Sequence, residues 1–163
     1  MTLQLTPPGA LLPSHRLGDF DCGEISLDHW LKHRALTNHL SGASRCFVVA
    51  DAQGVVYGYY ALAAGSLTHE LATGGVRRNM PDPIPVMVLA RLAVDRRAQG
   101  IQLGGALLKD AVKRTADIAQ HAGVRALLVH AIDESAKRFY EHYGFRESPQ
   151  NRMTLMSKVM GKP

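Results

Sequence analysis

The sequence reads Val86-Met87-Val88-Leu89-Ala90-Arg91-Leu92-Ala93-Val94, then Asp95-Arg96-Arg97-Ala98, then Gln99-Gly100-Ile101-Gln102-Leu103-Gly104-Gly105-Ala106-Leu107-Leu108, over the stretch that decides the fold. The most apolar run of the chain, from Pro85 to Val94, predicts a central strand. From Leu103 onward, apolar residues at 103, 107, 108, 111, 112, 118 and 119 trace one face of a helix. The stretch therefore predicts a strand, a glycine-rich loop and a helix in direct succession.

The junction between this loop and this helix is suited to bind a phosphate. The first N–H groups of a helix lack partners and lie at the positive end of its dipole, and glycines let an anion approach the backbone. Arg96 and Arg97 add positive charge nearby. The alternative is a strand-to-helix turn whose glycines serve geometry only. No Gly-Lys-Ser/Thr follows, as in a Walker loop, and the dinucleotide fingerprint Gly-x-Gly-x-x-Gly is absent.

Helices and strands alternate around this stretch. Ser26 is predicted to cap a helix that carries Trp30, Leu31 and Leu36 and is broken at 41–44. Strands are predicted at 46–50, 55–62, 124–131 and 151–160, with a polar connection at 65–83, a short helix at 135–142 stopped by Gly144, and Gly123 as the cap that ends the long helix. Met153, Leu155 and Val159 are predicted core residues of the last strand. This order predicts an α/β or α+β domain with one mixed sheet.

The composition limits the class of protein. The 163 residues, 46% of them hydrophobic and 20% charged, suffice for one domain with a sizeable core. A formal net charge of +5 favours polyanionic partners such as nucleic acid, anionic membranes or phosphorylated ligands. Cys22 and Cys46 form no disulfide framework and indicate reduced thiols. With neither a secretory signal nor a run of membrane-spanning length, we expect a cytoplasmic protein that does not act in a membrane.

A second motif, Phe139-Tyr140-Glu141-His142-Tyr143-Gly144-Phe145, follows the next apolar strand. A tyrosine can donate a proton to a leaving group of comparable pKa. By itself the motif has a simpler interpretation, because an aromatic cluster at the end of a helix usually packs in the core.

Together the two motifs resemble those of the GNAT superfamily of acyl-CoA N-acyltransferases. There a Gln/Arg-x-x-Gly-x-Gly/Ala motif lies between a central strand and a helix, and a later helix ends in Phe-Tyr-x-x-x-Gly-Phe. One register reads Gln99-x-x-Gln102-x-Gly104 and the other Arg97-x-x-Gly100-x-Gln102, so a glutamine replaces one glycine in either. The resemblance implies one GNAT domain over residues 1–163, with 1–15 as an N-terminal arm or edge strand. It also implies a mixed, mostly antiparallel sheet flanked by helices, with a V-shaped splay between the two central strands.

Further residues resemble one branch of the superfamily, the GNAT toxins of bacterial type II toxin–antitoxin modules. These residues are Arg77-Arg78-Asn79-Met80-Pro81-Asp82-Pro83-Ile84-Pro85 with Leu89–Asp95, and Phe20-Asp21-Cys22-Gly23 with Leu27–Leu31. Members of that branch acetylate the α-amine of an amino acid charged on tRNA and so block translation. The resemblance therefore implies aminoacyl-tRNA as substrate and a ribbon-helix-helix antitoxin as partner. It also implies a homodimer, and operator DNA bound and repressed only through the antitoxin complex.

The resemblance also assigns a site for acetyl-CoA, and it requires no metal. Backbone groups of Leu92, Ala93 and Val94 are expected to hold the acetyl and pantetheine end, with an N–H near Leu92 as oxyanion donor. Tyr140 is expected to protonate the CoA thiolate. The pyrophosphate-binding residues are expected to be Arg97, Gln99, Gly100, Ile101, Gln102, Leu103, Gly104 and Gly105. Glu134, His130 and His142 are the bases to check, although an α-amine with a pKa of about 7.7–8.0 is partly neutral without one.

Binding of tRNA requires positive surface, for which the best pair is Arg77-Arg78 beside a proline-rich turn, followed by Arg91, Lys32 and Arg34. Two alternatives stay open at this point. One is a GNAT that acetylates a protein N-terminus, lysine, polyamine or antibiotic amine, although the basic charge disfavours a polyamine. The other is a non-catalytic acyl-CoA-sensing or RNA-binding module, which the retained Tyr140 disfavours.

Overall fold

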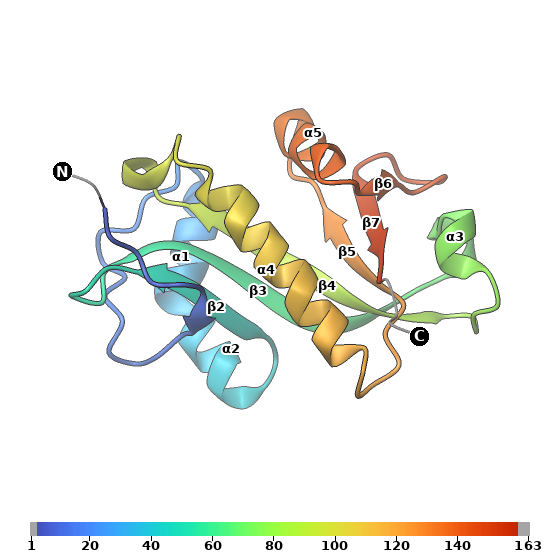
Figure 1. The fold of residues 1–163 in the computed structure, drawn as a ribbon, viewed down its shortest axis with the longest axis horizontal. Helices are drawn as coiled ribbons and strands as arrows, with labels where there is room; N and C mark the ends of the chain where they lie inside the picture. The colour runs from blue at the N-terminus through green and yellow to red at the C-terminus, as the bar shows by residue number, and fades with distance from the viewer. Residues whose placement is uncertain (1–2, 160–163) are drawn as a thin grey trace. The chain divides into compact units, whose positions relative to one another are not determined.

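The frame of the fold is a pair of long strands, β3 (Val56–Leu67) and β4 (Ile84–Val94), in a computed structural model that describes residues 3–159 (Figure 1). The shorter strands are β1 (Gly9–Ala10), β2 (Arg45–Ala50), β5 (Ala126–His130), β6 (Arg146–Glu147) and β7 (Thr154–Lys158). The helices are α1 (Ile25–His33), α2 (Ala35–Ser41), α3 (Gly74–Arg77), α4 (Leu103–Ile118) and α5 (Glu134–His142), with 3-10 turns η1 (His69–Leu71) and η2 (Arg96–Ala98).

The strands follow the order β1-β2-β3-β4-β5-β7-β6 in a seven-stranded sheet. β4 and β5 run parallel, with Met87–Leu89 beside Leu127–Val129, whereas β1–β2, β2–β3, β5–β7 and β6–β7 pair antiparallel. The predicted class, a mixed and mostly antiparallel sheet flanked by helices, is therefore confirmed. β1 lies at the edge, as predicted for an edge strand within residues 1–15.

By their internal contacts the described residues form two compact units. The first contains residues 3–63 and Arg91–Ala111, and the second contains Ala64–Ala90 and residues 112–159. β3, β4 and α4 each contribute residues to both units. The single domain over residues 1–163 and the splay between the central strands stay predictions.

In the first unit, successive side chains of β3 serve opposite faces of the sheet. Tyr59 faces α1, because its hydroxyl donates to the Leu27 carbonyl at 2.7 Å and its ring stacks on Trp30. Gly58 faces α4 instead, where a Cβ would approach the Leu107 side chain to 2.9 Å, so glycine is required for this close packing. The sheet of this unit thus carries α1 on one face and the first half of α4 on the other.

The second unit has its own core beneath α3. The buried side chains of Leu67, Ala72 and Val76 pack with those of Val86, Leu128 and Met156. The guanidinium of Arg125 fastens this segment, since it donates to the carbonyls of Gly75 at 3.0 Å, Val76 at 3.0 Å and Arg78 at 3.3 Å. Three orphan carbonyls at the end of a four-residue helix are thereby satisfied.

The predicted helix from Ser26 is wrong in two details. The helix begins at Ile25 after Glu24, so Ser26 lies inside the first turn and caps nothing. The backbone then leaves helical geometry at Arg34, with φ −126°, so α1 and α2 replace one continuous helix. The predicted break is confirmed, because α2 ends at Gly42, which has φ 81°.

Three other boundaries differ from prediction. β3 continues to Leu67, and the polar connection after it holds η1 and α3. α4 ends at Ile118, whose carbonyl accepts from the amides of His121 and Ala122, so the turn closes before Gly123 can cap it. In the last strand Leu155 is buried as predicted, whereas Met153 and Val159 are half-buried and the buried Met156 was missed. Residue 160 of that predicted strand lies outside the described residues.

Candidate active site

Asp95 organises the backbone between β4 and the glycine-rich loop. Its carboxylate is fully buried and accepts four hydrogen bonds. The donors are the Asp21 N–H at 3.0 Å and the backbone N–H, Nε and Nη2 of Arg97 at 2.8, 2.9 and 3.0 Å. Burial by itself raises the pKa of Asp95, but the hydrogen bonds from Arg97 and Asp21 outweigh it and hold the pKa below its ordinary value. The loop therefore starts from a rigid, charged anchor.

The side chains of two predicted phosphate-binding residues, Arg97 and Gln99, bind to this anchor and its neighbouring backbone. The guanidinium of Arg97 lies 4.6 Å from the ring centre of Tyr57 while it pairs with Asp95. The side-chain amide of Gln99 donates to the carbonyls of Val94 at 3.2 Å and Cys22 at 3.4 Å. Arg97 and Gln99 thus shape the loop with their side chains, and their backbone N–H groups are engaged as well, that of Arg97 by Asp95 at 2.8 Å and that of Gln99 by the Arg96 carbonyl at 3.4 Å.

The loop itself turns on two residues with left-handed backbone geometry. Gly100 has φ 86° and Gln102 has φ 62°. A residue with a Cβ pays about 1–2 kcal/mol for this conformation, so Gln102 occupies a position at which glycine is the unstrained choice. This observation favours the register that places Gln102 at the usual first glycine of the motif. The carbonyl of Gln102 accepts from the Ala106 N–H at 3.2 Å. The amides of Leu103, Gly104 and Gly105 precede this hydrogen bond at the start of α4 and therefore have no carbonyl of the helix to donate to.

The end of β4 presents the residues predicted to hold the acyl end of the ligand. Ala93 is buried in the core with Leu31 and Tyr59 on the α1 side, while Leu92 and Val94 are half-buried. β4 ends where the Asp95 N–H donates to the Tyr57 carbonyl at 2.8 Å. Leu92, Ala93 and Val94 therefore lie on a well-anchored strand next to the loop.

In the second unit, α5 presents Tyr140. The helix starts at Asp133, whose carboxylate accepts from the Ala136 N–H at 2.8 Å, and the chain after it turns at Gly144, with φ 90°. Tyr140 packs against Phe139 and Phe145 at ring-centre distances of 5.3 and 5.7 Å. The aromatic cluster and both helix ends therefore hold the phenol in one orientation.

The phenol of Tyr140 is set up to stay protonated. Its side chain is almost completely buried, and this burial raises the pKa of Tyr140 to about 12. The hydroxyl makes no hydrogen bond to another residue of the described part of the chain. A protonated phenol at neutral pH is the form that a proton donor requires.

The surroundings of the three possible bases give none of them a clear role as a general base. Glu134 pairs through both oxygens with Arg152, which holds the pKa of Glu134 below its ordinary value and weakens it as a base. Nδ1 of His130 lies 2.9 Å from the Thr154 hydroxyl, and the ring of His142 packs edge-on against Tyr143. Burial raises the pKa of Cys46 to about 12, and burial with a hydrogen bond to Asp28 does the same for Cys22, so neither thiol is an activated nucleophile.

The predicted RNA-binding residues fall in both units. Lys32 and Arg34 are exposed at and just after the end of α1, and Arg91 lies over the Trp30 ring of the same helix. Arg77 and Arg78 are exposed at the end of α3, on the segment that Arg125 fastens. Within the first unit, the structure therefore brings Arg91 to α1, which sequence spacing alone did not show.

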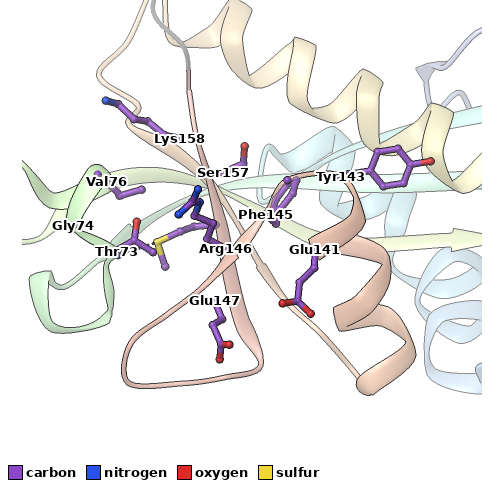
Figure 2. Close-up of a pocket in the computed structure, with 13 residues that line it drawn as sticks. Thr73, Gly74, Val76, Glu141, Tyr143, Phe145, Arg146, Glu147, Ser157 and Lys158 are labelled. Atoms are coloured by element: carbon purple, nitrogen blue, oxygen red, sulfur yellow. Dashed lines mark hydrogen bonds between the residues drawn. The ribbon is translucent and has the colours of Figure 1, made fainter.

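A hollow of about 910 Å³ lies in the second unit, and Figure 2 shows the residues that line it. Thr73–Val76 form one wall, Phe145 and Met156 are buried beneath it, and Glu141, Arg146, Glu147 and Lys158 bring charges of both signs. No predicted site residue lines it. Tyr140 itself does not line the hollow, although Phe145, which packs against Tyr140, does.

Residues 3–159 contain neither a cluster of metal ligands nor a membrane-spanning helix. No three His, Cys, Asp or Glu side chains lie close enough together to hold a metal ion. No helix in this range is long and apolar enough to cross a membrane.

Sequence reasoning missed the two residues that position the others, Asp95 and Trp30. The signal for Asp95 was an acidic residue directly before two arginines at the end of an apolar strand. The signal for Trp30 was weaker, because a lone tryptophan on a helix usually indicates core packing.

Comparison with known proteins places the chain in a family. The acetyltransferase (GNAT) domain model matches residues 42–147, so the chain belongs to the GNAT family of acetyltransferases. It is 53% identical over 137 residues to a tRNA-acetylating toxin of Mycobacterium tuberculosis, covering 84% of this chain and 82% of that one. It is 30% identical to a probable toxin TacT of Sinorhizobium fredii, covering 89% and 86% of the two chains.

Solved structures agree with this assignment. A mutant of KacT superposes with a TM-score of 0.89 at 25% identity, covering 96% of this chain and 95% of that one. AtaT in complex with acetyl-methionyl-tRNA superposes with a TM-score of 0.88 at 27% identity, covering 95% of both chains. AtaTR bound to acetyl-CoA superposes with a TM-score of 0.82 at 28% identity, covering 95% and 94%.

Proposed function

We propose that this chain is the toxin of a toxin–antitoxin module and that it acetylates the α-amine of aminoacyl groups on charged tRNA in the cytoplasm. The observation that carries the proposal is Tyr140, a buried phenol whose pKa is raised by burial to about 12, so that it stays protonated as a proton donor must. The 53% identity to a tRNA-acetylating toxin and the likeness to AtaT bound to acetyl-methionyl-tRNA support the choice of acceptor.

The residues present fit acetyl-CoA, which supplies the acetyl group as a reactive thioester. The amides of Leu103, Gly104 and Gly105 at the start of α4 bind the pyrophosphate, and the loop from Arg97 through Gln99, Gly100, Ile101 and Gln102 shapes their approach. Backbone groups of Leu92, Ala93 and Val94 orient the acyl end. The Leu92 N–H donates a hydrogen bond to the carbonyl oxygen as its negative charge grows.

The chemistry then needs one proton donor and no acyl-enzyme. The neutral α-amine forms the new N–C bond, the C–S bond breaks, and Tyr140 gives its proton to the departing thiolate. The proton that the amine loses passes to solvent, because an α-amine with a pKa of about 7.7–8.0 is already partly neutral. These steps account for every bond and proton without a metal or a dedicated base.

The proposal extends to partners. A structure of AtaT with the C-terminus of the antitoxin AtaR and a structure of the KacTA–DNA complex both resemble this chain, with TM-scores of 0.82 and 0.81. By analogy, a ribbon-helix-helix antitoxin neutralises this chain, the complex represses its operon at operator DNA, and the toxin is a homodimer. Exposed Arg77, Arg78, Lys32 and Arg34, together with Arg91, contact tRNA.

The direct test incubates the protein with radiolabelled acetyl-CoA and bulk charged tRNA and then deacylates the RNA. We expect N-acetylated amino acids, an activity at least 100-fold lower for Tyr140→Phe, and activity close to wild type for Tyr143→Phe in the same aromatic cluster. Growth arrest on expression of the wild type, relieved by Tyr140→Phe, is the cellular counterpart. Label in protein or small amines, with none in the aminoacyl fraction, favours the alternative GNAT that acetylates such amines and sinks this proposal.

A further inference from the structure

Among the residues that the structure describes, Arg91 is a half-buried cation without a counterion. Its Nε is sealed from solvent and has no hydrogen-bond partner. Within residues 3–159 its guanidinium makes no ion pair or hydrogen bond, and it lies over the Trp30 ring, 5.0 Å from the ring centre. An unpartnered buried polar group is costly and uncommon in a folded protein, so it calls for a physical explanation.

The support beneath Arg91 is rigid. Trp30 stacks on Tyr59 with ring centres 5.9 Å apart and planes 14° apart. Tyr59 is fully buried, bonded to the Leu27 carbonyl at 2.7 Å and packed edge-on against Phe20. The layered order Tyr59, Trp30, Arg91 therefore supports the guanidinium from below, and its two outer Nη groups, beyond the sealed Nε, are the donors left for a bidentate contact with an oxyanion.

The side of the sheet on which Arg91 lies indicates which anion it binds. Arg91 lies on the α1 side of β4, as Ala93 does, which packs with Leu31 and Tyr59. The start of α4, where the pyrophosphate of the acyl donor is proposed to bind, lies on the opposite face of the sheet of this unit, as Gly58 against Leu107 shows. Arg91 is therefore placed to bind the acyl acceptor rather than the acyl donor.

The surroundings on this face are basic. Lys32, His33 and Arg34 are exposed along the end of α1, and the rings of His29 and His33 lie 4.4 Å apart. Asp28, the acidic residue of α1, has its carboxylate engaged by the Cys22 N–H at 2.9 Å. A polyanion that approaches the end of α1 thus meets exposed positive charge, and Arg91 lies half-buried over Trp30 of the same helix.

Resting on the proposed function, we infer that Arg91, held on Trp30, binds the phosphodiester that joins the last two nucleotides of the charged tRNA. Arg91 directly precedes Leu92, the proposed oxyanion donor, and this phosphate is the anion nearest the aminoacyl ester in the acceptor. Arg91 thereby fixes the acceptor end next to the reacting amine and selects an aminoacyl nucleotide chain over a free amine. This role differs from the general electrostatic attraction supplied by Lys32 and Arg34.

The test uses cytidylyl-adenosine, the dinucleotide with this single phosphodiester, and adenosine as the probe without it. Trp30 is the only tryptophan of the chain, so its fluorescence reports binding at Arg91 directly. We expect a saturable change with the dinucleotide in the wild type and an affinity about 10- to 100-fold weaker in Arg91→Met. Arg16→Met, which removes an equal charge from an exposed position of the same unit, keeps the wild-type affinity.

Equilibrium dialysis with radiolabelled dinucleotide measures the same affinity without relying on the indole. Arg91→Lys, which keeps the charge but loses the planar fork, is expected to bind about 10-fold more weakly than the wild type, and it serves if Arg91→Met unfolds. The inference is overturned if the wild type does not bind the dinucleotide or if the variants bind it as the wild type does. It is also overturned if the affinity of the variants for adenosine falls by the same factor as their affinity for the dinucleotide. The acetyl-transfer assay is independent, so failure of the proposed function shows there, with the dinucleotide result unaffected.

Discussion

Replacing Asp95 by asparagine tests whether the buried carboxylate anchors the glycine-rich loop. An asparagine can keep the acceptor that serves the Arg97 N–H and Nε, but its NH₂ group then faces the donors Asp21 N–H and Arg97 Nη2. The part-buried Asp21 N–H loses its partner, which costs about 1–3 kcal/mol. Because the Arg97 side chain is 43% exposed, its lost ion pair adds only about 1 kcal/mol.

We therefore expect Asp95→Asn to lower the free energy of unfolding by about 2–4 kcal/mol, and the melting temperature by about 5–15 °C. Urea unfolding at pH 7 followed by circular dichroism measures the first quantity. Glu134→Gln is the matched control, because it removes a carboxylate from an exposed ion pair with Arg152, and we expect no resolvable change. The affinity for acetyl-CoA should fall in Asp95→Asn and not in Glu134→Gln, because Asp95 anchors the glycine-rich loop and Glu134 lies outside it.

The pH dependence gives the sign check. The pKa of Asp95 is lower in the folded protein than its ordinary value of 3.8. Its carboxylate therefore contributes its full stability above about pH 5 and loses it as the pH falls through the folded pKa. The deficit of Asp95→Asn relative to the wild type should shrink as the pH falls below the ordinary pKa of 3.8. A deficit below about 1 kcal/mol at pH 7, or one that is unchanged at pH 3, refutes the anchoring role.

Three further predictions follow from the same structure. Gln102→Gly should raise the free energy of unfolding by up to about 1 kcal/mol and keep acetyl-CoA affinity, because glycine removes left-handed strain, whereas a tenfold loss of affinity in calorimetry would show that the glutamine amide contacts the ligand. Glu147→Gln should destabilise by about 1–2 kcal/mol in urea unfolding because it leaves the buried Lys137 ammonium without its anion 3.3 Å away, and Lys137→Met, which removes the buried charge, should cost less. Since the pKa of Tyr140 is about 12, kcat with an amide-linked aminoacyl-RNA analogue should rise with deprotonation of the amine and show no fall up to pH 9, and a fall between pH 8 and 9 would exclude Tyr140 as the proton donor.

The sequence by itself determined the local units of this protein. The strand, loop and helix of 86–108 and the helix that presents Tyr140 were predictable because apolar period, glycine placement and a stop at Gly144 act within a few residues of each other. The membership of the GNAT family followed from these two motifs in order, and the family model over residues 42–147 agrees.

Only the tertiary structure decided how the side chains of the candidate site are used. Asp95 meets Asp21, 74 residues earlier in the chain, and Arg91 meets Trp30 on another element. These partners turn Arg97 toward the anchor of its own loop and leave Arg91 without a counterion among residues 3–159, although both are ordinary basic residues by sequence pattern. Sequence pattern reports which face of an element is apolar, but the charge that a buried arginine meets depends on which distant backbone folds against it.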